Sequence, residues 1–123
     1  LRMNPNDEQA LLLDAEIQAA TGNTDQAIGQ LQQILSLNPF QKKAYFLLGE
    51  LYLSLKETEK AIAVYDEAID INPNFAQAYQ ERGRIKLLNG DKEGSVADMK
   101  KALELAPETE EKINGQYNNF TDK

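Results

Sequence analysis

Residues 44–73 read AYFLLGELYLSLKETEKAIAVYDEAIDINP and decide the fold. Tyr45, Leu48 and Tyr52 recur at the spacing of one helix face, which predicts a first amphipathic helix. A short polar stretch at 55–58 interrupts the pattern, and helical spacing then resumes. The second run ends at an Asn-Pro pair, because the residue before a proline is disfavoured in the α conformation. The stretch therefore predicts two helices joined by a tight turn.

The whole chain repeats this pattern at a fixed interval. Its four prolines are separated by the same interval each time: Pro5, Pro39, Pro73 and Pro107. Other columns keep the same register, as Ala10, Ala44 and Ala78 do. We therefore divide the chain into repeats 1, 2 and 3, which cover 8–41, 42–75 and 76–109. A period of this length predicts stacked helix–turn–helix units and not one globular core.

Glycines mark the predicted turns and close helix contacts. Gly22 and Gly90 lie between the two helices of repeats 1 and 3, where glycine suits the end of a helix. Gly49 and Gly83 lie in the middle of predicted first helices, where glycine costs about 1 kcal/mol relative to alanine. We expect a neighbouring helix to pack against the backbone at both positions.

These columns resemble the tetratricopeptide repeat, a helix–turn–helix unit with the same period as this chain. Repeat 2 matches almost throughout, at Tyr45, Leu48, Gly49, Tyr52, Ala61, Tyr65, Ala68 and Pro73. Repeat 3 keeps part of the pattern, at Tyr79, Gly83, Ala102 and Pro107, and repeat 1 is the most divergent. The resemblance covers about 8–109 and implies an all-α fold, a right-handed α-solenoid of such repeats.

The two ends extend the repeat pattern. Residues 1–7 match the end of a second helix, so we expect them to be the tail of a preceding repeat in a longer protein. A short native protein with an unusual lead-in is the alternative. Residues 110–123 begin a further unit and carry one apolar stripe, which predicts a C-terminal capping helix and tail.

Arg82 occupies a column in which the family usually has leucine. Asp98 lies at the facing position of the second helix of repeat 3. We predict an ion pair between the two side chains. The alternative is that Arg82 extends along the surface and places its charge in water.

The resemblance implies that the first helices line a concave groove that holds a peptide segment of a partner protein. The positions carried over are Leu12, Glu16, Lys43, Phe46, Leu47, Glu50, Gln77, Gln80, Glu81 and Arg84. Their mixture of apolar and acidic side chains favours a neutral-to-basic, partly apolar segment. Two simpler interpretations stay open: the charges are solvated surface residues, or the apolar side chains pack against the adjacent repeat.

Some members of the family grip the C-terminal carboxylate of a chaperone with Lys, Asn and Arg side chains. The corresponding positions here are Leu12, Glu16, Leu47, Gln77 and Glu81. None of the clamp's Lys, Asn and Arg donors is present at these positions, and two of the positions hold acids, Glu16 and Glu81. A carboxylate would be repelled there, so we do not expect binding of a chaperone tail.

Composition narrows the chemistry further. The chain has 13 Lys+Arg against 20 Asp+Glu, a net charge of −7, and neither Cys nor His. It therefore lacks thiolate nucleophiles, cysteine-bound zinc and the commonest general base. We expect no catalysis, cofactor or metal, and no nucleic-acid or membrane partner, because those surfaces attract clustered Lys and Arg. Abundant Gln and Asn weakly favour a bacterial source, and no feature indicates a compartment.

The leading hypothesis is a non-catalytic scaffold that binds a peptide segment of a partner. The alternative is a structural role, in which the open end at Leu1 and Met3 stacks array on array through weak self-association or spaces domains in a larger protein. A third hypothesis places a catalytic domain elsewhere in a parent chain.

Overall fold

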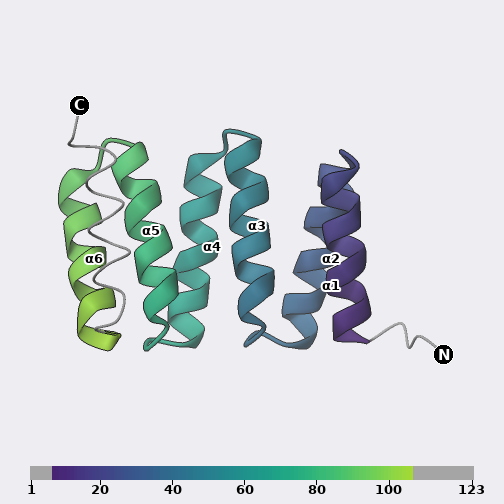
Figure 1. The fold of residues 1–123 in the computed structure, drawn as a ribbon, viewed down its shortest axis with the longest axis horizontal. Coiled ribbons are helices and arrows are strands. Elements are labelled where there is room, and N and C mark those ends of the chain that lie inside the picture. Colours follow the sequence, from purple (N-terminus) through teal and green to yellow (C-terminus); the bar gives the residue numbers. More distant parts are fainter. Residues whose placement is uncertain (1–6, 107–123) are drawn as a thin grey trace. The chain divides into compact units, whose positions relative to one another are not determined.

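The computed structural model describes residues 7–106, which form six α-helices and no strand within that range (Figure 1). The helices are α1 (Glu8–Ala20), α2 (Thr24–Leu37), α3 (Lys42–Ser54), α4 (Thr58–Ile71), α5 (Ala76–Leu88) and α6 (Lys92–Leu105). None of these described helices is long and apolar enough to span a membrane. The capping helix expected at 110–123, and all of the expected 1–7 tail except Asp7, lie outside the described residues.

Each predicted repeat contains two of the observed helices. By compactness the chain divides into an N-terminal unit, 1–64, and a C-terminal unit, 65–123, and the division falls inside α4. In the N-terminal unit α1 packs against α2, and α2 packs against α3. In the C-terminal unit α5 packs against α6. Within each unit, helices that follow one another along the chain are thus packing partners, and α1 also contacts α3, as expected of stacked repeats.

Aspartates begin two of the helices. The Asp7 side chain accepts hydrogen bonds from the backbone N–H groups of Gln9 and Ala10, at 3.1 and 3.4 Å. Asp91 accepts one from the N–H of Gly94 at 2.9 Å. These bonds satisfy N–H groups that have no partner in the first turn of a helix.

The turns inside the three repeats share one left-handed residue. Gly22 and Gly90 have φ angles of 89° and 87°, and Lys56 occupies the same column with φ of 61°. Glycine adopts this conformation without strain because it has no Cβ, whereas any other residue adopts it at an energetic cost. The expected role of the two glycines at helix ends is confirmed, and repeat 2 makes the same turn with a lysine.

In the N-terminal unit, the aromatic residue at the start of repeat 2 contacts the Asn-Pro pair at the end of repeat 1. The buried Tyr45 donates its hydroxyl to the carbonyl oxygen of Pro39 at 2.7 Å. The Glu8 carboxylate accepts from the side-chain amides of Asn38 at 2.6 Å and Gln41 at 3.1 Å. Together these bonds fix the turn between α2 and α3 against the starts of α1 and α3.

At Gly83 the backbone of α5 packs tightly against α6. A Cβ at this position would stand 3.1 Å from both the Asp98 Cβ and the Ser95 carbonyl oxygen, and 3.4 Å from the Met99 Cε. Ordinary Cβ contacts are longer than this. The expectation of a helix packed against the backbone at Gly83 is confirmed.

Candidate protein-binding face

Of the predicted groove residues, two lie on helix α1 and four lie on helix α3. Glu16 from α1 and Lys43 from α3 form an ion pair, with 2.8 Å between Oε1 and Nζ. Phe46 and Leu47 of α3 are partly exposed, and Glu50 is exposed. We call these five residues the α1–α3 face. The structure brings its first two members into direct contact.

Leu12 does not belong to this face, although we expected it there. Its side chain is buried, with 3% of its surface exposed, so it offers little for a partner to touch. The next residue, Leu13, is 59% exposed and is in the same repeat column as Leu47. A shift of one residue turns a helix by about 100°, which is enough to exchange a buried position for an exposed one.

Helix α5 carries the predicted groove residues of repeat 3, and they behave differently from one another. Gln77 is exposed, but Gln80 is buried with 5% of its surface accessible. Arg84 pairs with Glu81 one turn earlier, at 2.9 Å between Nη2 and Oε1. Gln80 is thus removed from the candidate contact surface, and Glu81 already has a cation beside it.

These two ion pairs reduce the negative charge that we expected from the acids among the predicted groove residues. Of the three predicted acids, Glu16 and Glu81 are each neutralised in part by a neighbouring base. The pair of Glu16 and Lys43 is solvent-exposed, and such a pair contributes about 0–1 kcal/mol to stability, so an incoming ligand can replace it at small cost. Glu50, on the α1–α3 face, is an exposed acid.

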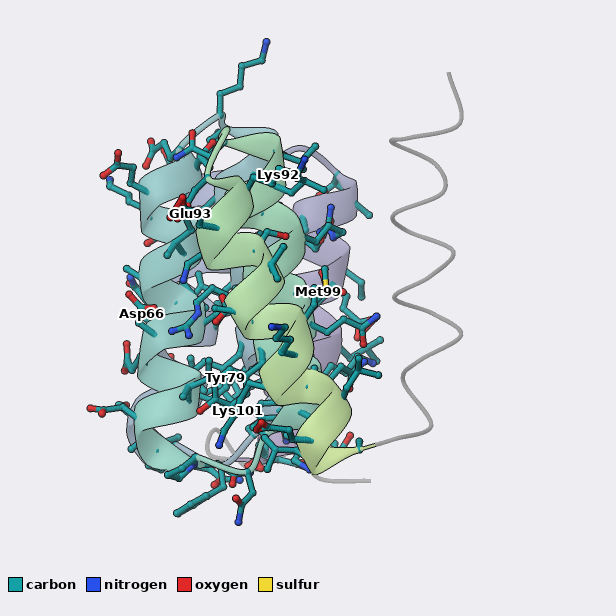
Figure 2. The ribbon with its side chains drawn as sticks, turned by 90° about the vertical axis from the view of Figure 1, so that its left-hand side faces the viewer. Asp66, Tyr79, Lys92, Glu93, Met99 and Lys101 are labelled. Atoms are coloured by element: carbon teal, nitrogen blue, oxygen red, sulfur yellow. The ribbon has the colours of Figure 1, made fainter. Side chains whose placement is uncertain are left out.

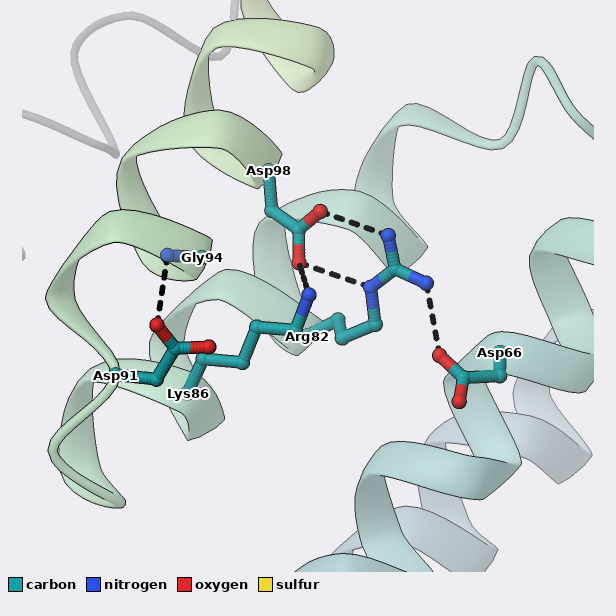
Figure 3. Close-up of polar contacts among 6 residues, drawn as sticks. All are labelled: Asp66, Arg82, Lys86, Asp91, Gly94 and Asp98. Atoms are coloured by element: carbon teal, nitrogen blue, oxygen red, sulfur yellow. Dashed lines mark hydrogen bonds and ion pairs between the residues drawn. The ribbon is translucent and has the colours of Figure 1, made fainter.

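A second polar cluster lies in the C-terminal unit around Arg82 (Figure 3). Its Nη2 and Nε donate to Asp98 at 2.7 and 2.8 Å, and its Nη1 donates to Asp66 of α4 at 2.8 Å. Lys86 approaches the same Asp98 carboxylate at 3.1 Å. The predicted Arg82–Asp98 ion pair is confirmed, while Asp66 and Lys86 were not foreseen. Figure 2 labels Asp66 on α4 and Tyr79, whose ring centroid lies 5.5 Å from the Arg82 guanidinium carbon.

The hydrogen bonds that Arg82 donates to Asp98 are the main cause that raises its pKa above the usual range, and the bond to Asp66 adds to it; burial opposes both. A raised pKa on a base means that its stabilisation is present throughout the ordinary pH range. That stabilisation is lost only as the pH rises through the pKa that the Arg82 guanidinium has in the folded protein. Arg82 therefore stays charged and acts as a structural link, not as a proton donor.

The repeat columns of Arg82 and Asp98 also face each other in repeats 1 and 2, where they hold other kinds of side chain. In repeat 1 the side-chain amide of Gln30 donates to Asp14 Oδ2. In repeat 2 the columns hold Leu48 and Val64, both buried. The facing positions of the two helices thus carry an amide–acid, an apolar and a charged combination in turn.

Among residues 7–106 no group of three or more His, Cys, Asp or Glu side chains is placed to hold a metal ion. The Asp98 carboxylate is the buried acid of that range, and Arg82 and Lys86 already occupy it.

Comparison with known families and structures places these features in context. Two models of the tetratricopeptide repeat family match the chain, over residues 12–74 and 64–97. No curated protein matches it. The expected all-α fold of helix–turn–helix repeats is confirmed by these matches and by the solved structures that resemble the chain.

Three of those structures illustrate the likeness. The crystal structure of MamA is 30% identical with a TM-score of 0.73, and covers 88% of this chain and 63% of its own. A thermophilic TPR protein from Thermus thermophilus is 26% identical with a TM-score of 0.76, covering 96% and 68%. PcrH, solved in complex with the chaperone-binding region of PopB, is 22% identical with a TM-score of 0.72, covering 87% of each chain. The present chain spans about three fifths of the MamA structures.

Proposed function

Because the chain belongs to the tetratricopeptide repeat family, we propose that it is a non-catalytic interaction module that binds a peptide segment of a partner protein. Tetratricopeptide repeats are generally a protein-interaction fold. The proposed contact surface is the α1–α3 face, extended by Leu13. Gln77, Glu81 and Arg84 of α5 are a second proposed strip, which we treat by itself.

The proposal rests mainly on exposed apolar side chains of the first helices of repeats 1 and 2. Two of these side chains occupy the same repeat column. Leu13 and Leu47 occupy that column, and Phe46 lies beside Leu47. All three keep part of their surface exposed in the folded chain. Exposed apolar side chains gathered on one face tend to mark contact sites. The ion pair of Glu16 and Lys43 would form the polar rim of such a contact.

The PcrH structure supports this class of function at the level of the fold. PcrH was solved with a segment of PopB, so the fold can hold a peptide. At 22% identity the likeness does not extend to the choice of ligand. The residues of this chain indicate that choice: the apolar column favours an aliphatic or aromatic side chain, and Glu50 favours a base next to it.

The experiment is a selection of peptides from a displayed random library, followed by measured affinities for the peptides recovered. We expect partly apolar, neutral-to-basic sequences. Phe46→Ala with Leu47→Ser should weaken binding at least tenfold, because the double change removes the apolar contact surface. Phe40→Ala is the matched control, since Phe40 is 66% exposed but lies in the turn between α2 and α3, outside the face.

Glu50→Lys separates charge from apolar contact. This reversal should shift the selected peptides from basic toward acidic sequences while their apolar positions persist. The proposal is wrong if the double variant binds the selected peptides as the wild type does, or if the Phe40→Ala control loses binding to the same extent.

A further inference from the structure

Glu16 obtains its counter-charge from the next repeat. Repeat 1 contains four Asp or Glu residues and no Lys or Arg, so it has no base of its own to place beside them. Lys43, the second residue of α3, supplies one, with its Nζ 2.8 Å from Glu16 Oε1. The same column holds glutamine in the other two repeats, at Gln9 and Gln77. The pair is therefore a feature of one repeat junction and not of the repeat architecture.

Lys43 is a weak partner for Glu16. Its side chain is 59% exposed and that of Glu16 is 36% exposed, so water and salt screen their attraction. Lys43 also lies in the first turn of α3, where the positive end of the helix dipole disfavours a cation and where no acid offsets it. Its compact ammonium contacts Glu16 Oε1. A donor that engages both carboxylate oxygens would bind Glu16 more strongly.

The ion pair lies beside the apolar part of the α1–α3 face. Glu16 follows Leu13 by three residues on α1, and Lys43 precedes Phe46 and Leu47 by three and four residues on α3. Side chains at these spacings are neighbours on a helix surface, so a segment that covers the apolar side chains also reaches the pair. Residues 7–64 carry eight Asp+Glu and four Lys+Arg, and this excess of acid attracts a basic segment.

We propose that an arginine of the bound segment displaces Lys43 and takes its place on Glu16. A guanidinium presents two parallel N–H donors to a carboxylate, whereas an ammonium bonds as a point charge. Lys43 is then an internal competitor of this arginine, and it sets how strongly the face selects for one. The inference rests on the proposed function, because it needs a segment bound on the α1–α3 face. It adds the chemistry of one ligand side chain and the residue that opposes it.

The peptides recovered from the displayed library are the probes. Each basic position of a recovered peptide is synthesised in turn with arginine, lysine and glutamine, and the affinities are measured by titration calorimetry. At one position arginine should bind the wild-type chain about fivefold more tightly than glutamine, with lysine between them. Glu16→Gln should remove that preference and leave the contribution of the apolar peptide positions unchanged.

Removal of the competitor should strengthen binding. Lys43→Gln installs the residue that the other two repeats have in this column, so α3 should form as before. It should raise the affinity for the arginine peptide about two- to fivefold, since the arginine no longer has to displace a partner from Glu16. When Glu16→Gln is already present, the same change should have no effect. Lys42→Gln is the matched control: it removes one positive charge at the adjacent exposed residue and should leave the affinity close to that of the wild type.

Salt dependence separates an exchange of partners from a simple gain of negative charge. In the wild type one ion pair breaks as another forms, so the affinity for the arginine peptide should fall only slightly with added salt. In Lys43→Gln a pair forms and none is lost, so the affinity should fall more steeply with salt. A general effect of net charge would appear equally in the Lys42→Gln control.

Failure of the inference can be told apart from failure of the proposed function. The inference alone is wrong if Phe46→Ala with Leu47→Ser weakens binding but Lys43→Gln does not strengthen it. It is also wrong if the arginine preference survives Glu16→Gln, because the arginine then binds another group. If the double apolar variant binds the peptides as the wild type does, the proposed function fails and the inference fails with it.

Discussion

Arg82 gathers acidic side chains from two helices because its guanidinium has donors pointing in several directions. Two of its nitrogens engage Asp98 side by side, and a third engages Asp66 on the preceding helix. A lysine could not make this planar, bidentate contact. The pairing offsets the cost of burying Asp98, whose side chain is only 6% exposed.

The first prediction concerns the loss of this pairing. Arg82→Leu should lower the free energy of unfolding by about 3 kcal/mol, because it leaves the buried Asp98 carboxylate with Lys86 alone. Adding Asp98→Val copies the buried Leu48 and Val64 of repeat 2 and should restore stability to within about 1 kcal/mol of the wild type. Urea denaturation followed by circular dichroism measures both. A double variant as unstable as the single one would contradict the explanation.

The second prediction compares two helical glycines. Gly29→Ala should stabilise the chain by about 0.5–1 kcal/mol, since a Cβ there meets nothing within 4 Å and alanine favours a helix. Gly83→Ala should destabilise it by about 1 kcal/mol net, because the new Cβ would press on the Ser95 carbonyl and Asp98 of α6. Thermal or urea unfolding of the two variants should show opposite signs. Equal stabilisation by both would show that α6 can move aside without cost.

At the scale of the elements, the turn of repeat 2 differs from its two counterparts. Lys56 adopts the left-handed conformation that Gly22 and Gly90 supply elsewhere. Among L residues this conformation costs about 1–2 kcal/mol, since Cβ crowds the following carbonyl. The backbone N–H of Glu57 donates to the Tyr52 carbonyl at 2.9 Å, and this bond keeps the turn closed despite the cost.

The third prediction follows from that turn. Lys56→Gly should raise the free energy of unfolding by about 0.5–1 kcal/mol, because relief of the left-handed strain exceeds the added freedom of the unfolded chain. Gly90→Lys should lower it by a similar amount for the inverse reason. Urea midpoints of the two variants provide the measurement, and Lys56→Ala controls for the loss of the charge. If Lys56→Ala stabilises as much as Lys56→Gly, the side chain and not the backbone is responsible.

At the scale of the whole molecule, the fold followed from the sequence because its signal is repeated. Each column is sampled three times, so the helices and their partners could be assigned before any contact was known. The Arg82–Asp98 pair could be predicted for the same reason, since two opposite charges occupied facing columns.

The contacts that could not be predicted depend on long side chains and on the details of burial. Asp66 and Lys86 join the Arg82 cluster through rotamers that the residue order does not specify. Leu12 and Gln80 were assigned to the groove by position, but the packing of neighbouring helices buries them. The ion pair of Glu16 and Lys43 did have a signal, opposite charges on successive first helices, which could have been used.

The last prediction concerns how far a local change is felt. In a repeat architecture each element depends mainly on its neighbours, so local stability is not uniform along the chain. Leu31→Ala removes a completely buried side chain of α2 and should cost about 2–5 kcal/mol. Native-state hydrogen exchange should then show a larger loss of protection for amides in α1 and α2 than in α5 and α6. Arg82→Leu, in the C-terminal unit, should produce the reverse pattern. If either variant lowers protection equally in all four helices, residues 7–106 unfold as one cooperative body, and the division within α4 has no energetic counterpart.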